Sequence, residues 1–406
     1  MNPIAPLILA ALFLIAPAAA QDEPGAPSTP AQAPAVQSAD ALQPRPGPGG
    51  RRWRIGYVQS GDYQEYPRTL AALVQGLRQL GWLSIGEIPA GLDGRQTWNY
   101  IAEHARSDTL SFVRDAWWQP GDFDASARPA MRQAIQDRLT RQGDVDLMIA
   151  MGTWAGQDMA AIGPPVPTVV GSASDPVGAG IVASAADSGR ENLHARVEPE
   201  RYEQQIRLFN SIVPFRTLGV VYEDTAEGRG YAALDALRRV AGERGFRVVP
   251  CQARTSGVGA PQAQLNVLTC YKRLAATVEA MYVTVSSGLT ADITRRLAAL
   301  LRTRRIPSFA MLGAEEVQNG LLLSMARADY ASVGRFHAAI IARILRGESP
   351  RRISQLWREP ARIAVNFKTM RLIGFDPPME LLLAADDIFE LANGPGPAQS
   401  VTFIQH

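Results

Sequence analysis

Histidine and cysteine are scarce in this chain of 406 residues, which contains four of the first and two of the second. The histidines, His104, His194, His337 and His406, do not have the spacing of metal ligands. The sequence also lacks the G-x-S-x-G, Walker and H-E-x-x-H motifs of common hydrolases, nucleotide-binding proteins and metalloproteases. We therefore expect no metal, no cofactor and no enzymatic activity.

A large basic excess and a second long apolar run are also missing. The formal net charge is +2, whereas a dedicated nucleic-acid surface needs a much larger positive charge. Beyond the N-terminus, no segment approaches the roughly 20 apolar residues that a membrane helix requires. We expect no nucleic-acid partner and no membrane span, and we expect a monomer.

The N-terminus carries the features of a secretory signal. Residues 4–15 are almost entirely apolar, and Ala18, Ala19 and Ala20 follow Pro17. Such a run before small residues is typical of a signal peptide, here residues 1–20, with cleavage expected between Ala20 and Gln21. Because position 21 is not Cys, a lipid-anchored mature N-terminus is excluded. The sequence predicts a free periplasmic protein.

Residues 21–51 form a Pro-rich segment with few large apolar side chains. Seven prolines and four glycines fall within residues 21–50. Such a composition buries too little surface to offset the entropy of ordering, so we expect a disordered tether. The folded body is expected to begin near Arg52.

The two cysteines, Cys251 and Cys270, leave two alternatives open. In an oxidising compartment they could form a disulfide that closes a short loop. They could equally be two unpaired thiols, one at a strand end and one on a helix face.

From residue 53 onward, short β-rich runs alternate with helical periodicity. The expected strands are 53–58, 146–150, 168–170, 218–222, 246–249, 280–283 and 306–310. The expected helices are 66–80, 128–141, 153–162, 199–212, 228–244, 261–276 and 290–304. This alternation predicts an α/β protein with two doubly wound parallel-sheet lobes. Segment 83–108 interrupts the rhythm and is interpreted as an insertion with one helix at 98–105.

Polar and aromatic side chains recur just after the expected strands. Ligands of doubly wound sheets bind beyond the carboxyl ends of the strands, so these residues are the candidate site. The helix start at Gly152, Thr153 and Trp154 offers free N–H groups to an anion. The alternative is that the hydroxyls are helix caps and the aromatics are core. The candidates are Ser60, Asp62, Tyr63, Gly152, Thr153, Trp154, Ser174, Asp175, Tyr222, Glu223, Ser286 and Ser287.

Three groups of residues carry a resemblance to a known family. They are Ser174-Asp175-Pro176-Val177-Gly178-Ala179-Gly180-Ile181-Val182, Met151-Gly152-Thr153 with Ala155, and Val365-Asn366-Phe367-Lys368-Thr369. With these motifs, residues 53–390 resemble the periplasmic substrate-binding proteins of ABC transporters, specifically those related to tryptophan and tyrosine receptors. The resemblance implies a small-molecule ligand and an ABC permease as partners.

The resemblance also implies the type I periplasmic binding protein fold, with a hinge of three crossovers near 195–199, 325–328 and 347–352. Lobe one would comprise residues 52–197 and 326–350, and lobe two would comprise residues 198–325 and 351–392. Residues 393–406 would form a C-terminal tail. Family members that bind amino acids carry Asp-Asn where this chain has Ser286 and Ser287. Bound in the usual way, an amino acid would therefore lack its partner for the ammonium group, unless Glu223 or Asp175 supplies the missing charge.

Two other functions compete with the importer. A ligand-sensing module for a signalling receptor would share every feature above, and a hydrolase in the cleft is the weakest alternative. A repressor of the same fold would need a DNA-binding helix-turn-helix before the first lobe, where this sequence has the signal and the tether.

Overall fold

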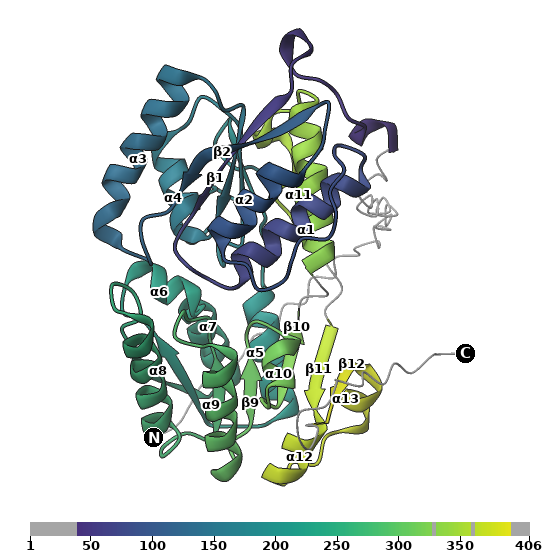
Figure 1. Cartoon of the computed structure of the whole chain (residues 1–406). Coiled ribbons are helices and arrows are strands. Elements are labelled where there is room, and N and C mark those ends of the chain that lie inside the picture. The colour runs from purple at the N-terminus through teal and green to yellow at the C-terminus, as the bar shows by residue number, and fades with distance from the viewer. Residues whose placement is uncertain (1–38, 327–329, 359–361, 391–406) are drawn as a thin grey trace, which may run out of the picture. The chain divides into compact units, whose positions relative to one another are not determined.

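The computed structural model describes residues 39–326, 330–358 and 362–390 (Figure 1). The chain divides into two units, Met1–Ser38 and Ala39–His406, and all described residues belong to the second. The predicted signal peptide, the first part of the tether and the predicted tail 393–406 lie outside the described residues. The rest of the tether contains two 3-10 helices, η1 (Ala39–Leu42) and η2 (Pro48–Gly50). Trp82 Nε1 donates to the Leu42 carbonyl at 2.8 Å, so the described fold begins before the expected Arg52.

The first lobe is built on a five-stranded parallel sheet in the order β2-β1-β3-β4-β5. Its strands are β1 (Trp53–Gln59), β2 (Leu110–Trp118), β3 (Leu147–Met151), β4 (Thr168–Gly171) and β5 (Leu193–Ala195). Its helices are α1 (Glu65–Gln79), α2 (Gly94–His104), α3 (Arg128–Asp137), α4 (Thr153–Ile162) and α11 (Tyr330–Leu345), with η3 (Ala125–Ala127), η4 (Arg138–Gln142) and η5 (Pro350–Arg352).

Neighbouring residues of one strand pack into different cores, because side chains of a strand alternate between the two faces. Met148 and Ala150 pack with α3 and α4. Leu147 and Ile149 pack with α1, α2 and α11. Both faces of the sheet are therefore covered by helices, as parallel sheets require.

The second lobe is built on a seven-stranded sheet in the order β12-β11-β10-β9-β8-β6-β7. All pairs are parallel except β10 with β11. Its strands are β6 (Thr217–Tyr222), β7 (Arg247–Gln252), β8 (Ala280–Val283), β9 (Ser308–Ala310), β10 (Leu323–Ala326), β11 (Arg362–Asn366) and β12 (Ala385–Phe389). Its helices are α5 (Arg201–Ile212), α6 (Ala226–Tyr231), α7 (Leu234–Arg244), α8 (Ala260–Leu274), α9 (Ala291–Thr303), α10 (Ala314–Gln318), α12 (Phe367–Ile373) and α13 (Met379–Ala384).

Two sequence predictions about elements were wrong in detail. Segment 83–108 is part of the crossover from β1 to β2, since Trp98 of α2 is fully buried and stacks on Tyr57 of β1 at 5.3 Å between ring centroids. The expected helix 228–244 is two helices, α6 and α7, because Ala233 adopts a left-handed conformation with φ of 49°. The glycines Gly228 and Gly230 in α6 are weak helix formers, which favours a short helix there.

The chain passes three times between the lobes. The first connection lies between β5 and α5, and the second between β10 and α11 includes residues outside the described part of the chain. The third follows η5. Because Gln355 still bonds to the Ala195 N–H at 2.7 Å and to the Val197 N–H at 2.7 Å, this crossing lies later than the expected 347–352.

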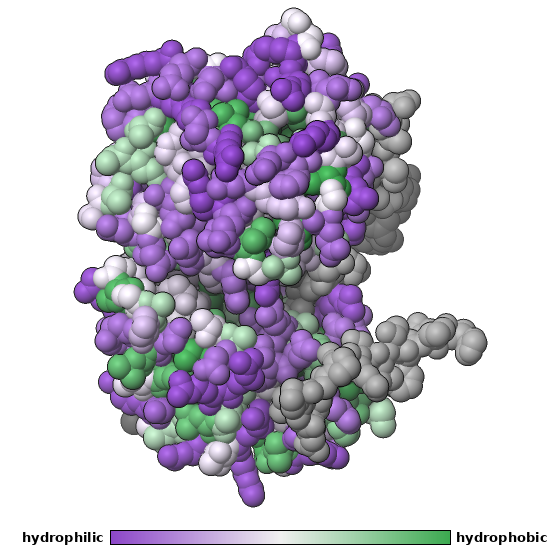
Figure 2. Space-filling view, viewed as in Figure 1, coloured by the Kyte–Doolittle hydropathy of each residue, from purple (hydrophilic) through white to green (hydrophobic). Residues whose placement is uncertain are grey.

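None of the described helices is long and apolar enough to cross a lipid bilayer. Hydrophilic residues predominate on the face of both lobes shown in Figure 2.

Candidate functional site

A pocket lies between the two lobes at the carboxyl ends of their central strands. The first sheet has the strand order 2-1-3-4-5, and β7-β6-β8-β9-β10 repeats it in the second. In this topology the chain leaves the central strands in opposite directions, so a crevice opens beyond their carboxyl ends. The pocket is lined by residues that follow β1, β3 and β4 in one lobe and β6, β7 and β8 in the other.

The start of α4 forms one wall of the pocket. Thr153 and Trp154 line it, and both are buried. Gly152 precedes them with φ of +95°, and a Cβ there would fall 2.1 Å from Tyr66 Oη and 2.4 Å from Ser60 Oγ. Ser60 Oγ accepts a hydrogen bond from the Ala155 N–H at 3.0 Å, so this serine fixes the helix start from behind.

Two tyrosines after β1 form the adjoining wall. Tyr63 and Tyr66 line the pocket with their rings 5.3 Å apart in an edge-to-face arrangement. Burial raises the pKa of both phenols, so both stay neutral. Asp62 instead lines a neighbouring groove beside residues 88–94. Its pKa is raised by burial and by the nearby charge of Asp122.

The loop after β4 contributes two serines. Ser172 holds a left-handed backbone with φ of 54°, an uncommon conformation for a residue other than glycine and typical of functional sites. Ser174 also lines the pocket, and its carbonyl accepts a hydrogen bond from Tyr202 of the second lobe at 3.0 Å. Asp175 is exposed and accepts from the Gly178 N–H at 2.9 Å, so it shapes its own turn.

On the second lobe, Tyr222 and Glu223 follow β6. The Glu223 carboxylate accepts hydrogen bonds from the backbone and hydroxyl groups of Thr255 and Ser256, at 2.7 to 3.2 Å. These donors come from the loop after β7, which also lines the pocket. Glu223 therefore holds two pocket walls together within one lobe.

The remaining walls come from β8 and α6. Ser286 and Ser287 line the pocket, and Ser286 Oγ accepts from the Gly288 N–H at 3.1 Å. Glu227 and Tyr231 of α6 line it too. α6 ends at Tyr231, and Ala233, with φ of 49°, separates it from α7.

The pocket contains most of the residues that the sequence nominated. Ser60 and Gly152 lie beneath the α4 start, whereas Asp62 and Asp175 lie outside the lining. Sequence reasoning missed four aromatic side chains, because they come from helix faces and a loop where they looked like core. They are Tyr66, Phe123, Tyr231 and Tyr271. Only Tyr66, three residues after Tyr63 in the first turn of a helix, carried a signal.

Three buried polar atoms of the lining have no hydrogen-bond partner among the described residues. They are the indole N–H of Trp154, a residue that is 6% exposed, and the hydroxyls of Tyr63 and Tyr271. Leaving a buried donor unpaired costs about 1–3 kcal/mol, so such atoms indicate a partner that the protein itself does not supply. In the described residues, no group of His, Cys, Asp or Glu could hold a metal ion. The arrangement is suited to binding.

Comparison with known proteins agrees with this geometry. The family described as ABC transporter substrate binding protein matches residues 123–388, well over half of the chain. No curated protein matches. An ABC domain from Streptococcus pneumonia in complex with L-Trp is similar in structure, with a TM-score of 0.64 and 16% identity over 83% of this chain and 100% of that one.

Two further solved structures show the same fold. A conserved domain protein from Vibrio cholerae has a TM-score of 0.63 and 19% identity over 84% of this chain and 100% of that one. An open, ligand-free substrate-binding protein with adhesive properties from Clostridium difficile has a TM-score of 0.55 and 20% identity. The match covers 80% of this chain and 96% of that one. With two lobes of type I periplasmic binding protein topology and the family match, the chain belongs to the substrate-binding proteins of ABC transporters.

Proposed function

We propose that this protein captures a small solute between its lobes and delivers it to an ABC permease in the inner membrane. The observation that carries the proposal is the interlobe pocket, whose lining leaves the Trp154 indole N–H and the Tyr63 hydroxyl buried without partners among the described residues. A ligand that accepts hydrogen bonds would satisfy both groups.

An electron-rich group of the ligand, such as a carboxylate, would lie at the start of α4. The unpaired N–H groups and the positive end of the helix dipole favour such a group there. The Thr153 hydroxyl and the Trp154 N–H are further donors on this wall. Tyrosine and phenylalanine side chains on the other walls would pack against a flat apolar part of the ligand.

The cellular location and the oligomeric state of the protein are part of the proposal. A mature chain that begins at Gln21 would act as a monomer in the periplasm, with the tether between the cleavage site and the first lobe. N-terminal sequencing of the exported protein tests this, and an intact Met1 on a cytoplasmic protein would contradict it.

A thermal-shift screen tests the binding function. Amino acids, small carboxylates, nucleosides, sugars and aromatic amines form the panel, since a ligand raises the melting temperature according to its concentration relative to Kd. Calorimetry then measures the best compound with Trp154→Phe and Thr153→Ala. Each should weaken binding by roughly one to two decades, the effect of losing a hydrogen bond of about 1.5–3 kcal/mol.

Thr140→Ala is the matched control, because Thr140 is exposed and bonds only to the Gln136 carbonyl of its own helical segment. If Trp154→Phe and Thr153→Ala bind as tightly as the wild type, the pocket is not the site of capture.

A further inference from the structure

We propose that the ligand is a small organic cation, an amine or quaternary ammonium compound, whose positive group lies against Glu227 and the aromatic side chains beside it. This inference rests on the proposed function and deepens it, because it assigns a charge to the solute. A carboxylate on the ligand is not required.

The charge of the pocket lining has one sign. The lining contains two carboxylates, those of Glu223 and Glu227, and no lysine, arginine or histidine. Arg128 lies nearby with its guanidinium 4.7 Å from the centre of the Trp154 ring, but it pairs with Asp158 at 2.9 Å. A buried anionic ligand would thus meet no basic side chain within the lining, whereas a cation would meet a carboxylate.

The two carboxylates differ in what they already bind. Glu223 accepts hydrogen bonds from Thr255 and Ser256 on both of its oxygens. Glu227 has no hydrogen bond or ion pair within the part of the chain that the structure describes, although it is only partly exposed. Glu227 is therefore the carboxylate that is available to a ligand.

Aromatic side chains from both lobes line the same pocket. Tyr63, Tyr66, Phe123 and Trp154 come from the first lobe, and Tyr222, Tyr231 and Tyr271 come from the second. Tyr231 is four residues after Glu227, so both lie on one side of α6. A cation within about 6 Å of an aromatic ring is attracted by its negative face, and aromatic cages bind quaternary ammonium groups in this way.

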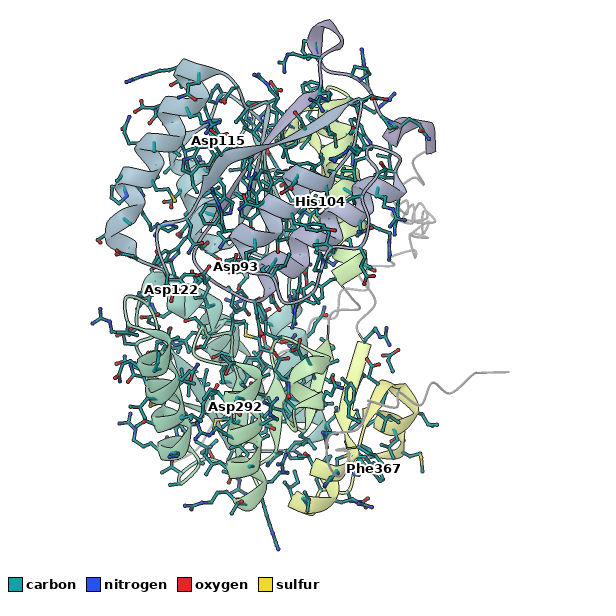
Figure 3. The ribbon with its side chains drawn as sticks, in the orientation of Figure 1. Asp93, His104, Asp115, Asp122, Asp292 and Phe367 are labelled. Carbon is teal, nitrogen blue, oxygen red and sulfur yellow. A yellow bond between two sulfur atoms is a disulfide. The ribbon has the colours of Figure 1, made fainter. Side chains whose placement is uncertain are left out.

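The entrance to the pocket is acidic as well. Asp93 and Asp122 lie on the edge of the first lobe that faces the second (Figure 3). A groove that shares Glu223 and Ser256 with the pocket is also lined by Asp124, Asp224 and one basic residue, Arg254. Asp224 pairs with Arg229 at 2.8 Å, so Asp124 and Glu223 carry the negative charge of this groove. A field of this sign raises the local concentration of cations and speeds their entry.

The unpaired indole N–H of Trp154 indicates a second feature of the ligand, besides its positive charge. It needs an acceptor, and an uncharged hydroxyl or carbonyl oxygen of the ligand suffices, because the donors at the α4 start are neutral groups. The class that fits both walls is a flat amine that also carries a hydroxyl or carbonyl oxygen. An amine without that oxygen loses the hydrogen bond to Trp154 but keeps the charge interaction with Glu227.

Calorimetry on the full exported chain with matched indole compounds tests the inference. Tryptamine and its trimethylammonium analogue carry the positive charge, tryptophol has a hydroxyl in its place, and indole-3-propionate carries a negative charge. We expect both cations to bind at least tenfold more tightly than tryptophol, and indole-3-propionate to bind most weakly.

Glu227→Gln should weaken tryptamine binding by about tenfold to a hundredfold and leave tryptophol binding within threefold. Glu380→Gln is the control, because Glu380 is an exposed carboxylate on α13 in the second lobe. Unchanged tryptamine affinity in Glu227→Gln would overturn the assignment of Glu227.

The remaining outcomes separate the inference from the proposed function. Tryptophol or indole-3-propionate binding as tightly as tryptamine overturns the inference and leaves the solute receptor intact. L-Tryptophan binding more than tenfold tighter than tryptamine also overturns it, since a carboxylate would then be required. If no indole compound binds, the aromatic amines of the thermal-shift panel decide the inference: the cationic class is rejected when none of them binds, and the other compounds of the panel decide the receptor function.

Discussion

Gly152 is the residue on which the geometry of the α4 start depends. Its φ of +95° and ψ of 167° are accessible essentially only to glycine. Its missing Cβ also leaves room for Tyr66 Oη and Ser60 Oγ, the groups that line and support the pocket wall. Conformation and packing therefore both require glycine at this position.

Gly152→Ala should lower the free energy of unfolding by about 2–4 kcal/mol, because strain and a steric clash add. Gly163→Ala is the matched control at the other end of α4. Gly163 also has a positive φ, +59°, but nothing lies within 4 Å of its Cβ position, so about 1 kcal/mol is expected. Urea unfolding measures both variants. Equal losses would show that crowding behind the helix start contributes nothing.

At the scale of elements, the sequence predicted most of the long helices, but it missed the nine-residue strand β2 and the interruption at Ala233. The helix 153–162 agrees with α4, because its boundaries are glycines and its spacing is regular. The break at Ala233 could not be predicted, since alanine favours helix and only the tertiary packing imposes its left-handed conformation. Tyr231, the last residue of α6 before this break, lines the pocket.

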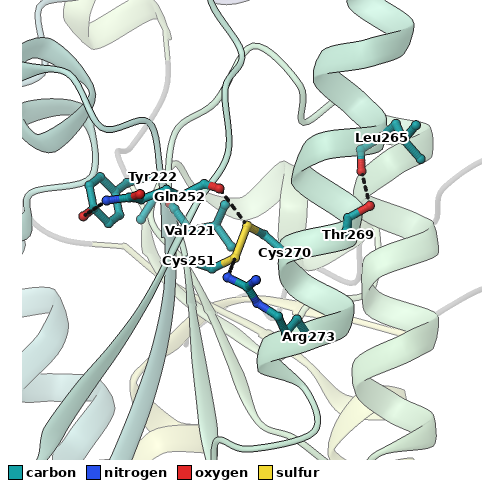
Figure 4. Close-up of a disulfide and its surroundings, with 9 residues drawn as sticks. Val221, Tyr222, Cys251, Gln252, Leu265, Thr269, Cys270 and Arg273 are labelled. Atoms are coloured by element: carbon teal, nitrogen blue, oxygen red, sulfur yellow. Dashed lines mark hydrogen bonds between the residues drawn. A yellow bond between two sulfur atoms is a disulfide. The ribbon is translucent and has the colours of Figure 1, made fainter.

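The disulfide between Cys251 of β7 and Cys270 of α8 connects a strand to a helix (Figure 4). Replacing both cysteines with alanine should lower the unfolding free energy by about 3 kcal/mol, the value for closing a loop of this order of length. Thermal melting with and without dithiothreitol measures the effect, and the double variant, which has no disulfide, should not respond to the reductant. A wild type whose melting temperature is unchanged after verified reduction would contradict the prediction.

His194 of β5 should make stability depend on pH. Burial lowers its pKa to about 4, whereas in the unfolded chain it titrates near about 6.5. Below about pH 6.5, His194 binds a proton in the unfolded chain, whereas in the folded protein it stays neutral until the pH approaches 4. The unfolding free energy should therefore fall by roughly 3 kcal/mol between pH 6.5 and 4.

Urea unfolding across this pH range measures the slope for the wild type and for His194→Gln, in which it should be shallower. His104→Gln is the control, since His104 is exposed at the end of α2. An identical slope in His194→Gln and in the wild type would exclude His194 as the source.

At the scale of the molecule, the alternation of strands and helices predicted two doubly wound lobes, and the structure confirms them. The shared strand order explains why residues after the central strands meet in one pocket. The aromatic walls were not predictable in the same way. Tyr231 and Tyr271 are on helices, and which helix faces turn toward the other lobe depends on the packing of both lobes.

Ligand binding should close the lobes about their connections. Tyr202 and Ser174 already make one hydrogen bond between the lobes, and Arg68 of α1 pairs with Glu315 of α10. Small-angle scattering with the best compound of the thermal-shift panel should show a smaller radius of gyration than the free protein. An unchanged scattering profile at saturation would contradict capture by closure.

The position of the disulfide has a consequence for when the protein can work. Thr255 and Ser256, which line the pocket, lie within the loop that Cys251 and Cys270 close. In a reducing cytosol the thiols stay separate, so this wall loses its covalent link to α8 and keeps hydrogen bonds such as those to Glu223. For a chain that is exported as proposed, we therefore expect weak binding of the solute until the two thiols are oxidised outside the cytosol. The cell's own pool of that solute would thus be spared from sequestration by the precursor.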